Sequence, residues 1–296
     1  MPDRRSGIGW PQKEQGAVDI DRIRAWGAEP TTDVYDAQRT ILYALGIGIT
    51  PDGRDLDFVY EARLRAFPTL AVTLGAENFL RGERHGELDW SQVLHAAQSV
   101  EWHRPLPPTG RVAARSEVEA IVDRGAGRGA LIQLARHLSD AQDGQPLATL
   151  RFTLFARGDG GGGISFGSLD LPAELPATSP DDSLALPTRP DLAAIYRLSG
   201  DLNPLHIDPD AARRAGFDRP ILHGLCSYGI AARALSTMLL DGAGERLARL
   251  DVRFSAPVFP GDTLVTEVWR SGDREARFRV RARDVAVLDK GLVRWR

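Results

Sequence analysis

Residues 196–229 read YRLSGDLNPLHIDPDAARRAGFDRPILHGLCSYG, and this stretch decides the fold. It places an acid, an amide and an imidazole close together, at Asp201, Asn203 and His206. Because Pro204 lies between them, the three side chains cannot occupy one regular helix. The glycine and the asparagine of the stretch favour a tight, exposed loop. Such a loop can turn a carboxylate and an imidazole toward one point, where they can hold a water molecule and move its proton.

Further along the same stretch, His223 and Gly224 stand at the start of an apolar run, for which we predict a helix over residues 224–240. The first N–H groups of a helix have no acceptor within the helix and form the positive end of its dipole. A glycine at this point lets a ligand come close, so its N–H can stabilise a developing oxyanion. The His223 side chain is expected to hold the loop.

The stretch resembles the hydratase motif of the MaoC-like, type 2 enoyl-CoA hydratase family, whose pattern is aromatic-x-x-Ser-Gly-Asp-x-Asn-Pro-hydrophobic-His. Every fixed position of that pattern is met, by Tyr196, Ser199, Gly200, Asp201, Asn203, Pro204, Leu205 and His206. The chain's Leu-His-Gly at residues 222–224 resembles the landmark that opens the central helix of the family's hotdog fold. The resemblance covers residues 30–290. It implies an α+β double hotdog, two antiparallel sheets each wrapped around a central helix.

The resemblance also implies an activity, the reversible hydration of a trans-2-enoyl-CoA to a (3R)-3-hydroxyacyl-CoA. Asp201 and His206 match the family's catalytic pair, and Gly224 matches its oxyanion donor. Asn203 is the residue that would fix the water or the loop, since an amide can both donate and accept hydrogen bonds. The family needs no metal and no cofactor beyond the CoA thioester that is its substrate.

Four further residues are expected to contact the substrate by resemblance. Phe254 would line the path of the acyl chain or the pantetheine arm. In the N-terminal half, His95, Ala96 and Arg124 match positions that contact CoA, although the family usually has glycine where Ala96 stands. A physical argument also supports Arg124 as a CoA contact, because a cation in a turn can bind a phosphate.

Less specific interpretations stand beside these. Without the full motif, Asp201 would be read as a turn or capping residue. Asp201, His206, Asp208 and Asp210 could form a metal site by composition, but we expect none. The glycines at 160–163 could cradle a phosphate, yet no Gly-Lys-Ser/Thr follows, so a flexible linker is favoured.

The composition is that of an ordinary globular protein of 296 residues, with 43% hydrophobic and 26% charged residues. A net charge of -3 argues against a general nucleic-acid binder. The single cysteine, Cys226, cannot form an internal disulfide and is expected to be a packed side chain. No run approaches the roughly 18 apolar residues of a membrane span. No secretory or peroxisomal signal is evident, so we expect a cytoplasmic protein.

The order of elements predicts two related halves. We expect an N-terminal extension over 1–30, a degenerate hotdog over 31–156, a linker over 157–188 and a catalytic MaoC-like hotdog over 189–296. Strands are predicted over 111–123, 129–139, 145–156, 249–254, 262–271, 275–284 and 285–295. Further predictions are short helices over 19–26, 191–198 and 209–215, a helix capped by Thr32 and Asp33, and a short strand over 58–60.

Three alternatives stay open at this point. Within the hydratases, the substrate could be branched or dicarboxylic, as mesaconyl-CoA is, and acyl carrier protein could replace CoA. A non-catalytic acyl-CoA-binding subunit is the rival from another class, and a thioesterase would share the fold but not the motif. Because hotdog sheets usually pair, a homodimer is expected.

Overall fold

The computed structural model describes residues 23, 30–75, 88, 92–163, 165–169 and 174–296. Within these ranges, ten strands form one continuous sheet in the order β1-β3-β4-β5-β2-β7-β10-β9-β8-β6. Every neighbouring pair is antiparallel. The sheet therefore consists of two five-stranded halves that join where β2 pairs with β7.

The two halves repeat one order of strands outward from this junction. The N-terminal half comprises β1 (Thr31–Tyr35), β2 (Val93–Trp102), β3 (Gly110–Asp123), β4 (Ala130–Asp140) and β5 (Pro146–Ala156). The C-terminal half comprises β6 (Asp182–Pro187), β7 (Leu247–Phe254), β8 (Thr263–Gly272), β9 (Glu275–Ala282) and β10 (Val285–Trp295). The α-helices whose bounds lie within the described ranges are α2 (Ala37–Gly46), α3 (Leu192–Tyr196), α4 (Pro209–Arg214) and α5 (Gly224–Leu240).

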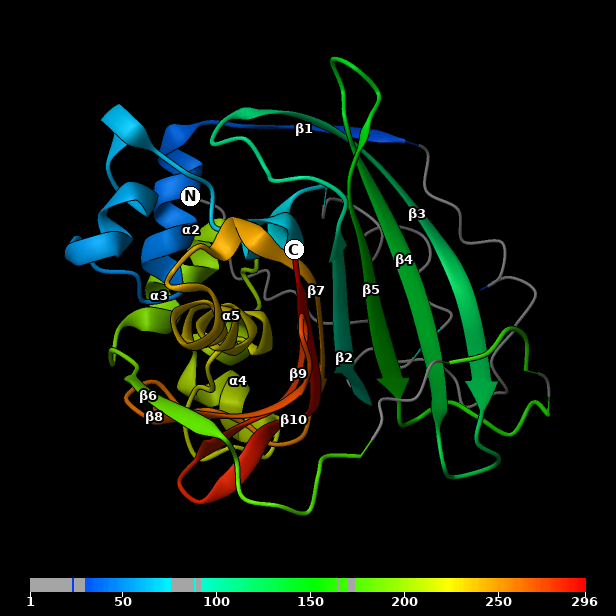
Figure 1. The fold of residues 1–296 in the computed structure, drawn as a ribbon. Helices are drawn as coiled ribbons and strands as arrows, with labels where there is room; N and C mark the ends of the chain where they lie inside the picture. The colour runs from blue at the N-terminus through cyan, green and yellow to red at the C-terminus, as the bar shows by residue number, and fades with distance from the viewer. Residues whose placement is uncertain (1–22, 24–29, 76–87, 89–91, 164, 170–173) are drawn as a thin grey trace, which may run out of the picture.

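Helix α5 lies in the curve of the C-terminal half, wrapped by β6 to β10 (Figure 1). Its sequence, GLCSYGIAARALSTMLL, is apolar on almost every side, as a helix surrounded by protein requires. The helix ends at Asp241, whose φ of 53° is left-handed. Its bounds are those predicted from the sequence, and the same holds for β10.

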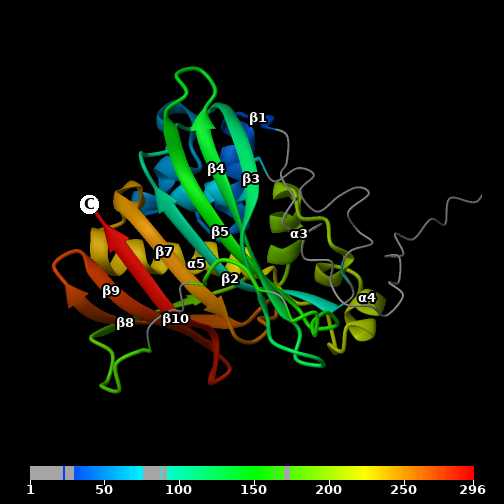
Figure 2. The same ribbon diagram turned by 90° about the vertical axis from the view of Figure 1, so that its right-hand side faces the viewer.

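The N-terminal half is covered differently. Between β1 and β2 the described elements are α2 and three short 3₁₀ helices, Gly53–Phe58, Glu61–Arg63 and Pro68–Thr73. In Figure 2, the long strands β3, β4 and β5 extend well beyond α5. A second, smaller apolar cluster fills part of that half, formed by Ile23, Leu88, Val118, Ile121, Ile132, Leu134, Leu154 and Ala156.

Some local predictions for this half are wrong. Thr32 and Asp33 lie in β1, and the helix that follows is capped by Asp36, whose side chain accepts a hydrogen bond from the N–H of Arg39. The stretch 58–60 contains the end of the 3₁₀ helix Gly53–Phe58 and its C-terminal cap, Val59, and belongs to no strand of the sheet. The helix predicted over 19–26 lies outside the described residues except at Ile23.

The C-terminal half follows its predictions more closely. The helices expected over 191–198 and 209–215 correspond to α3 with a following 3₁₀ turn and to α4. The stretch 157–188, expected to cross as a linker, ends in β6, which pairs with β8. In the described part of the chain, no helix is long and apolar enough to cross a membrane.

The turn between β9 and β10 makes a first prediction possible. It passes through Arg283 and Asp284, both with left-handed φ values of 50° and 62°. This geometry favours glycine, above all at the second position. Arg283 is held in place by Asp262, at 2.9 Å, whereas the Asp284 side chain is fully exposed.

We therefore expect Asp284→Gly to raise the free energy of unfolding by about 0.5 kcal/mol, because the relieved left-handed strain exceeds the added chain entropy. Asp273→Gly, in the turn between β8 and β9, is the matched control and should lower it, since Asp273 has no positive φ. Denaturant unfolding of both variants measures the difference. An equal decrease in the free energy of unfolding of both variants would contradict the proposed backbone strain at Asp284.

Candidate active site

The loop between α3 and α4 carries the three polar residues of the motif. It leaves the preceding helix at Gly200, whose φ of 122° suits only glycine. The Asp201 Oδ1 accepts a hydrogen bond from the N–H of Asn203 at 3.1 Å, and the Asn203 Oδ1 accepts one from the N–H of Leu205 at 3.0 Å. These two bonds fix the loop locally. The structure confirms that the three residues do not share a regular helix.

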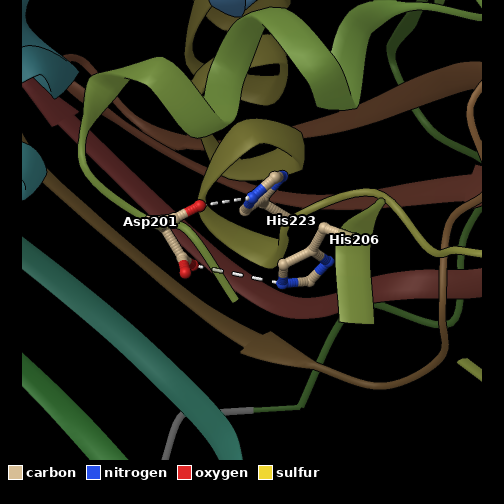
Figure 3. Close-up of side chains that lie close together, drawn as sticks. All are labelled: Asp201, His206 and His223. Atoms are coloured by element: carbon tan, nitrogen blue, oxygen red, sulfur yellow. Dashed lines mark hydrogen bonds and ion pairs between the residues drawn. The ribbon is translucent and has the colours of Figure 1, made fainter. Parts of the chain in front are cut away.

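Asp201 and His206 face one another across this loop (Figure 3). The Asp201 Oδ2 lies 4.0 Å from the His206 Nε2. The carboxylate side chain is 50% exposed, whereas the imidazole is only 10% exposed. One member of the pair is thus open to solvent while the other is set into the protein.

The hydrogen bonds of His206 fix the position of its proton. Its Nδ1 lies 2.9 Å from the carbonyl oxygen of Ile221. Because a carbonyl can only accept, Nδ1 carries the hydrogen and Nε2 keeps a lone pair directed toward Asp201. Burial lowers the pKa of His206, against the opposing effect of the Asp201 charge. The ring is therefore a neutral base at neutral pH.

His223 supports both members of this pair. Its Nε2 donates to the main-chain carbonyl of Asp201 at 3.1 Å, and its ring stacks on His206 with centroids 3.7 Å apart and an interplanar angle of 30°. On its other side the ring lies 5.0 Å from that of Tyr196. Burial, with His206 second, lowers the pKa of His223 to about 4. A neutral His223 adds no charge against the His206 ring.

Gly224 is the first residue of α5 and is exposed. Its N–H belongs to the first turn of the helix, where intrahelical acceptors are lacking. A Cβ at this position would lie 3.1 Å from the Phe254 ring, so a side chain here would crowd β7. The glycine thus leaves the N-terminus of α5 open beside Phe254.

The N-terminal half reaches this place through His95 of β2. The His95 ring lies 4.7 Å from the Phe254 ring, and its Nε2 donates to the Ala97 carbonyl at 3.0 Å. Burial lowers the pKa of His95 to about 4, although the charge of Asp201 acts in the opposite direction. Residues that are far apart in sequence, His95, Asp201 and Phe254, therefore share one locality.

The other two predicted substrate contacts are placed differently. Ala96 lies at a bulge, where the register of β2 against β5 shifts between His95 and Ala97. Arg124 follows β3, and its guanidinium lies 5.5 Å from the Phe155 ring. Among the described residues, no contact joins Arg124 to Asp201 or His206.

Asp201, His206 and His223 offer donor atoms within 4.8 Å of one another, a spacing at which three groups can ligate a metal ion. The donor set suits proton transfer better. Each imidazole already gives one N–H to a main-chain carbonyl, which leaves His206 Nε2 as a base next to the Asp201 carboxylate. Asp208 instead caps α4 by accepting from the N–H of Asp210.

The comparisons with known proteins agree with this geometry. A family model described as MaoC like domain matches residues 172–290, and one described as MFE-2 hydratase 2 N-terminal domain matches residues 34–158. The chain is 38% identical to 3-hydroxyacyl-thioester dehydratase Y of Mycobacterium tuberculosis, with 94% of this chain and 99% of that protein covered. The chain belongs to the MaoC-like dehydratase family.

Two further relatives extend the comparison of this MaoC-like protein. It is 34% identical to the peroxisomal enoyl-CoA hydratase 2 of Arabidopsis thaliana, with 90% of this chain and 93% of that protein covered. The crystal structure of a MaoC-like dehydratase from Phytophthora capsici superposes with a TM-score of 0.84 at 34% identity, covering 94% of this chain and 99% of that one.

These findings confirm the predicted family, the double hotdog fold and the assignment to the hydro-lyase enzymes. The roles of individual residues in this MaoC-like protein stay predictions. Sequence reasoning did not foresee the stacking of His206 on His223 or the contact of His95 with Phe254. The stacking had a signal in the sequence, since His223 directly precedes Gly224, the predicted oxyanion donor.

Two histidines, His95, which is half-buried, and His223, which is buried, predict how stability depends on pH. His95 and His223 have a pKa near 4 in the fold and an ordinary value of 6.5 when unfolded. Between these values the unfolded chain binds protons that the folded chain does not, so the free energy of unfolding should fall as pH decreases through this window. We expect a smaller fall in His95→Phe, measured by denaturant unfolding from about pH 7 to about pH 5. An unchanged pH dependence would show that His95 is not held neutral.

Proposed function

We propose that this protein catalyses the reversible hydration of a trans-2-enoyl-CoA to a (3R)-3-hydroxyacyl-CoA. The observation that carries the proposal is that the Asp201 Oδ2 and the unprotonated His206 Nε2 lie 4.0 Å apart, two acceptors that can share one water molecule, beside the open N-terminus of α5. The names of relatives that span nearly the whole chain support the reaction class. The R configuration of the product follows the family and not the geometry.

Hydration begins with a water molecule that contacts both Asp201 and His206. His206 takes a proton from the water as its oxygen forms a bond to C3 of the enoyl group. The electron pair of the C2–C3 double bond moves onto the thioester carbonyl, whose oxygen becomes an enolate that the Gly224 N–H stabilises. The acid–base pair then returns a proton to C2, and dehydration runs through the same steps in reverse.

The remaining residues would position the reactants. Asn203 stiffens the loop through its bond to the N–H of Leu205. His95 and Phe254 would line the substrate path next to Gly224, and Ala96 and Arg124 would lie along the CoA moiety. In this proposal residues 189–296 of the C-terminal half supply the catalytic groups, and the half over 31–156 completes the substrate site.

The proposal also covers the carrier of the acyl group, the cellular location and the oligomeric state. A CoA thioester is the first choice, with acyl carrier protein as the alternative, and the chemistry uses only the chain's own groups and the thioester. A cytoplasmic location and a homodimer remain predictions from the sequence. A non-catalytic acyl-CoA-binding subunit is disfavoured because binding alone does not require a base with a free lone pair beside a carboxylate.

The catalytic assignment predicts that Asp201→Asn and His206→Gln each lower the turnover rate by about 10² to 10⁴-fold while the fold is kept. The loss of enoyl-thioester absorbance with crotonyl-, octenoyl- and dodecenoyl-CoA measures the rate. Asp210→Asn, an exposed carboxylate paired with Arg213, is the control and should retain activity. Near-normal turnover in either test variant would remove that residue from the mechanism. Tight acyl-CoA binding without turnover in the wild type would favour the binding subunit.

His223 is expected to act as a positioning residue for Asp201 and His206. His223→Phe keeps a ring against His206 but loses the donor to the Asp201 carbonyl, whereas His223→Gln keeps a donor and loses the stack. Each should lower kcat by about 10 to 100-fold with a smaller change in KM, because the pair is misplaced rather than removed. Because His223 is already neutral, His223→Phe should leave the acid limb of the pH–rate profile in place. A wild-type kcat in both variants would reduce His223 to a packing role.

A further inference from the structure

Arg136 of β4 is a charged residue on the inner face of the N-terminal half. It is 7% exposed, and it follows Ile132 and Leu134 at the two-residue period of the strand, which are both fully buried. Burying a guanidinium costs several kcal/mol unless an anion and hydrogen-bond acceptors surround it. Its surroundings therefore have to be accounted for in full.

The protein itself offers Arg136 little. Its Nη1 lies 3.4 Å from the carbonyl oxygen of Leu74, a long hydrogen bond, and its Nε is buried with no acceptor among the residues that the structure describes. The guanidinium carbon lies 5.6 Å from the Phe152 ring. Burial lowers the pKa of Arg136 to about 10, which still leaves the group charged at neutral pH.

One carboxylate acts on Arg136 through its charge, that of Asp33. Asp33 is already committed elsewhere. Its two oxygens accept from the Nη1 and Nη2 of Arg39 at 2.7 and 3.0 Å, and one of them also accepts from the N–H of Gly75 at 2.9 Å. Within the described part of the chain, Arg136 is therefore a buried cation that forms no ion pair.

A line of rings connects Arg136 to the candidate active site. Phe152 of β5 lies 6.2 Å from His95 of β2, which lies 4.7 Å from Phe254 of β7, next to Gly224. The four strands β4, β5, β2 and β7 are consecutive in the sheet. The line thus crosses from the catalytic half into the N-terminal half and begins where the thioester would be bound.

We propose that Arg136 binds a carboxylate at the far end of the acyl chain, which makes ω-carboxy enoyl thioesters a substrate class of this protein. The inference rests on the proposed hydratase function. Aromatic rings suit the methylene groups between the two ends, and a guanidinium matches a carboxylate through two parallel hydrogen bonds. The unused Nε of Arg136 supplies one of these donors.

Because Arg136 has a fixed position, its distance from Gly224 limits the length of the acyl chain that can reach both residues. The thioester is held at one end by Gly224 and the carboxylate at the other by Arg136, so only one length, or two adjacent lengths, can satisfy both. Preference for the carboxylate-terminated substrate should therefore pass through a maximum as the chain grows. A chain that is too short would leave its carboxylate buried among the rings of Phe152 and His95 and be disfavoured.

The test compares kcat/KM for two matched series of trans-2-enoyl-CoAs of increasing length, one ending in a methyl group and one in a carboxylate. We expect the ratio of carboxylate to methyl in the wild type to peak at one length. Arg136→Met, which keeps the volume and removes the charge, should lower the ratio at the peak by about 10 to 100-fold, because hydrogen bonds to a charged group are lost. Turnover of the methyl series should persist.

The controls separate this inference from the function on which it rests. Arg115→Met, an exposed arginine of β3, should keep the wild-type ratio at every length. A ratio in Arg136→Met equal to that of the wild type would overturn the inference. A wild-type protein that prefers the methyl series at every length would also overturn the inference. This second test does not depend on whether the Arg136→Met variant folds. Failure of the wild type on both series would instead count against the hydratase function.

Discussion

The pairing of β2 with β7 is the contact on which the rest of the molecule depends. Five residue pairs, from Ala97 with Arg253 to Glu101 with Arg249, turn two five-stranded sheets into one. Near its middle, the Ser99 hydroxyl donates to Asp251 at 2.6 Å across the two strands. Because His95 and Phe254 lie just beyond the same end of this pairing, it also decides which residues of the two halves meet.

Helix α5 makes the second link between the halves. A Cβ at Gly229 would lie 2.5 Å from the Ile47 side chain at the end of α2, so the glycine lets the two helices approach closely. The Cys226 thiol donates to the carbonyl of Gly46 at 3.2 Å, which accords with its expected packing role. The helix that begins directly after His223 is therefore held in place by the N-terminal half. Neither half presents the site alone.

The sequence predicts best what is encoded locally. The motif loop and the bounds of α5 follow from proline, glycine and an apolar run that act within a few residues of one another. The meeting of His95 with Phe254 could not be predicted in this way, because it depends on strand pairing between residues that are far apart in the chain. The inward position of Arg136 could be read from the sequence, because the residue continues the two-residue alternation in which Ile132 and Leu134 face the core. A polar residue at an inward position of a strand is informative for that reason.

The two ends of the β2–β7 pairing are related by an approximate two-fold axis, because the strands are antiparallel and occupy equivalent places in their halves. Phe254 lies one residue beyond the paired segment of β7, and Trp102 lies one residue beyond that of β2. Trp102 is 3% exposed and donates its indole N–H to the carbonyl of Pro68 at 2.9 Å. Two identical hotdogs would form two equal sites by symmetry. Here the packing of Trp102 fills the equivalent position, so this end of the pairing stabilises the core of the fold where its counterpart leaves Phe254 beside the open start of α5.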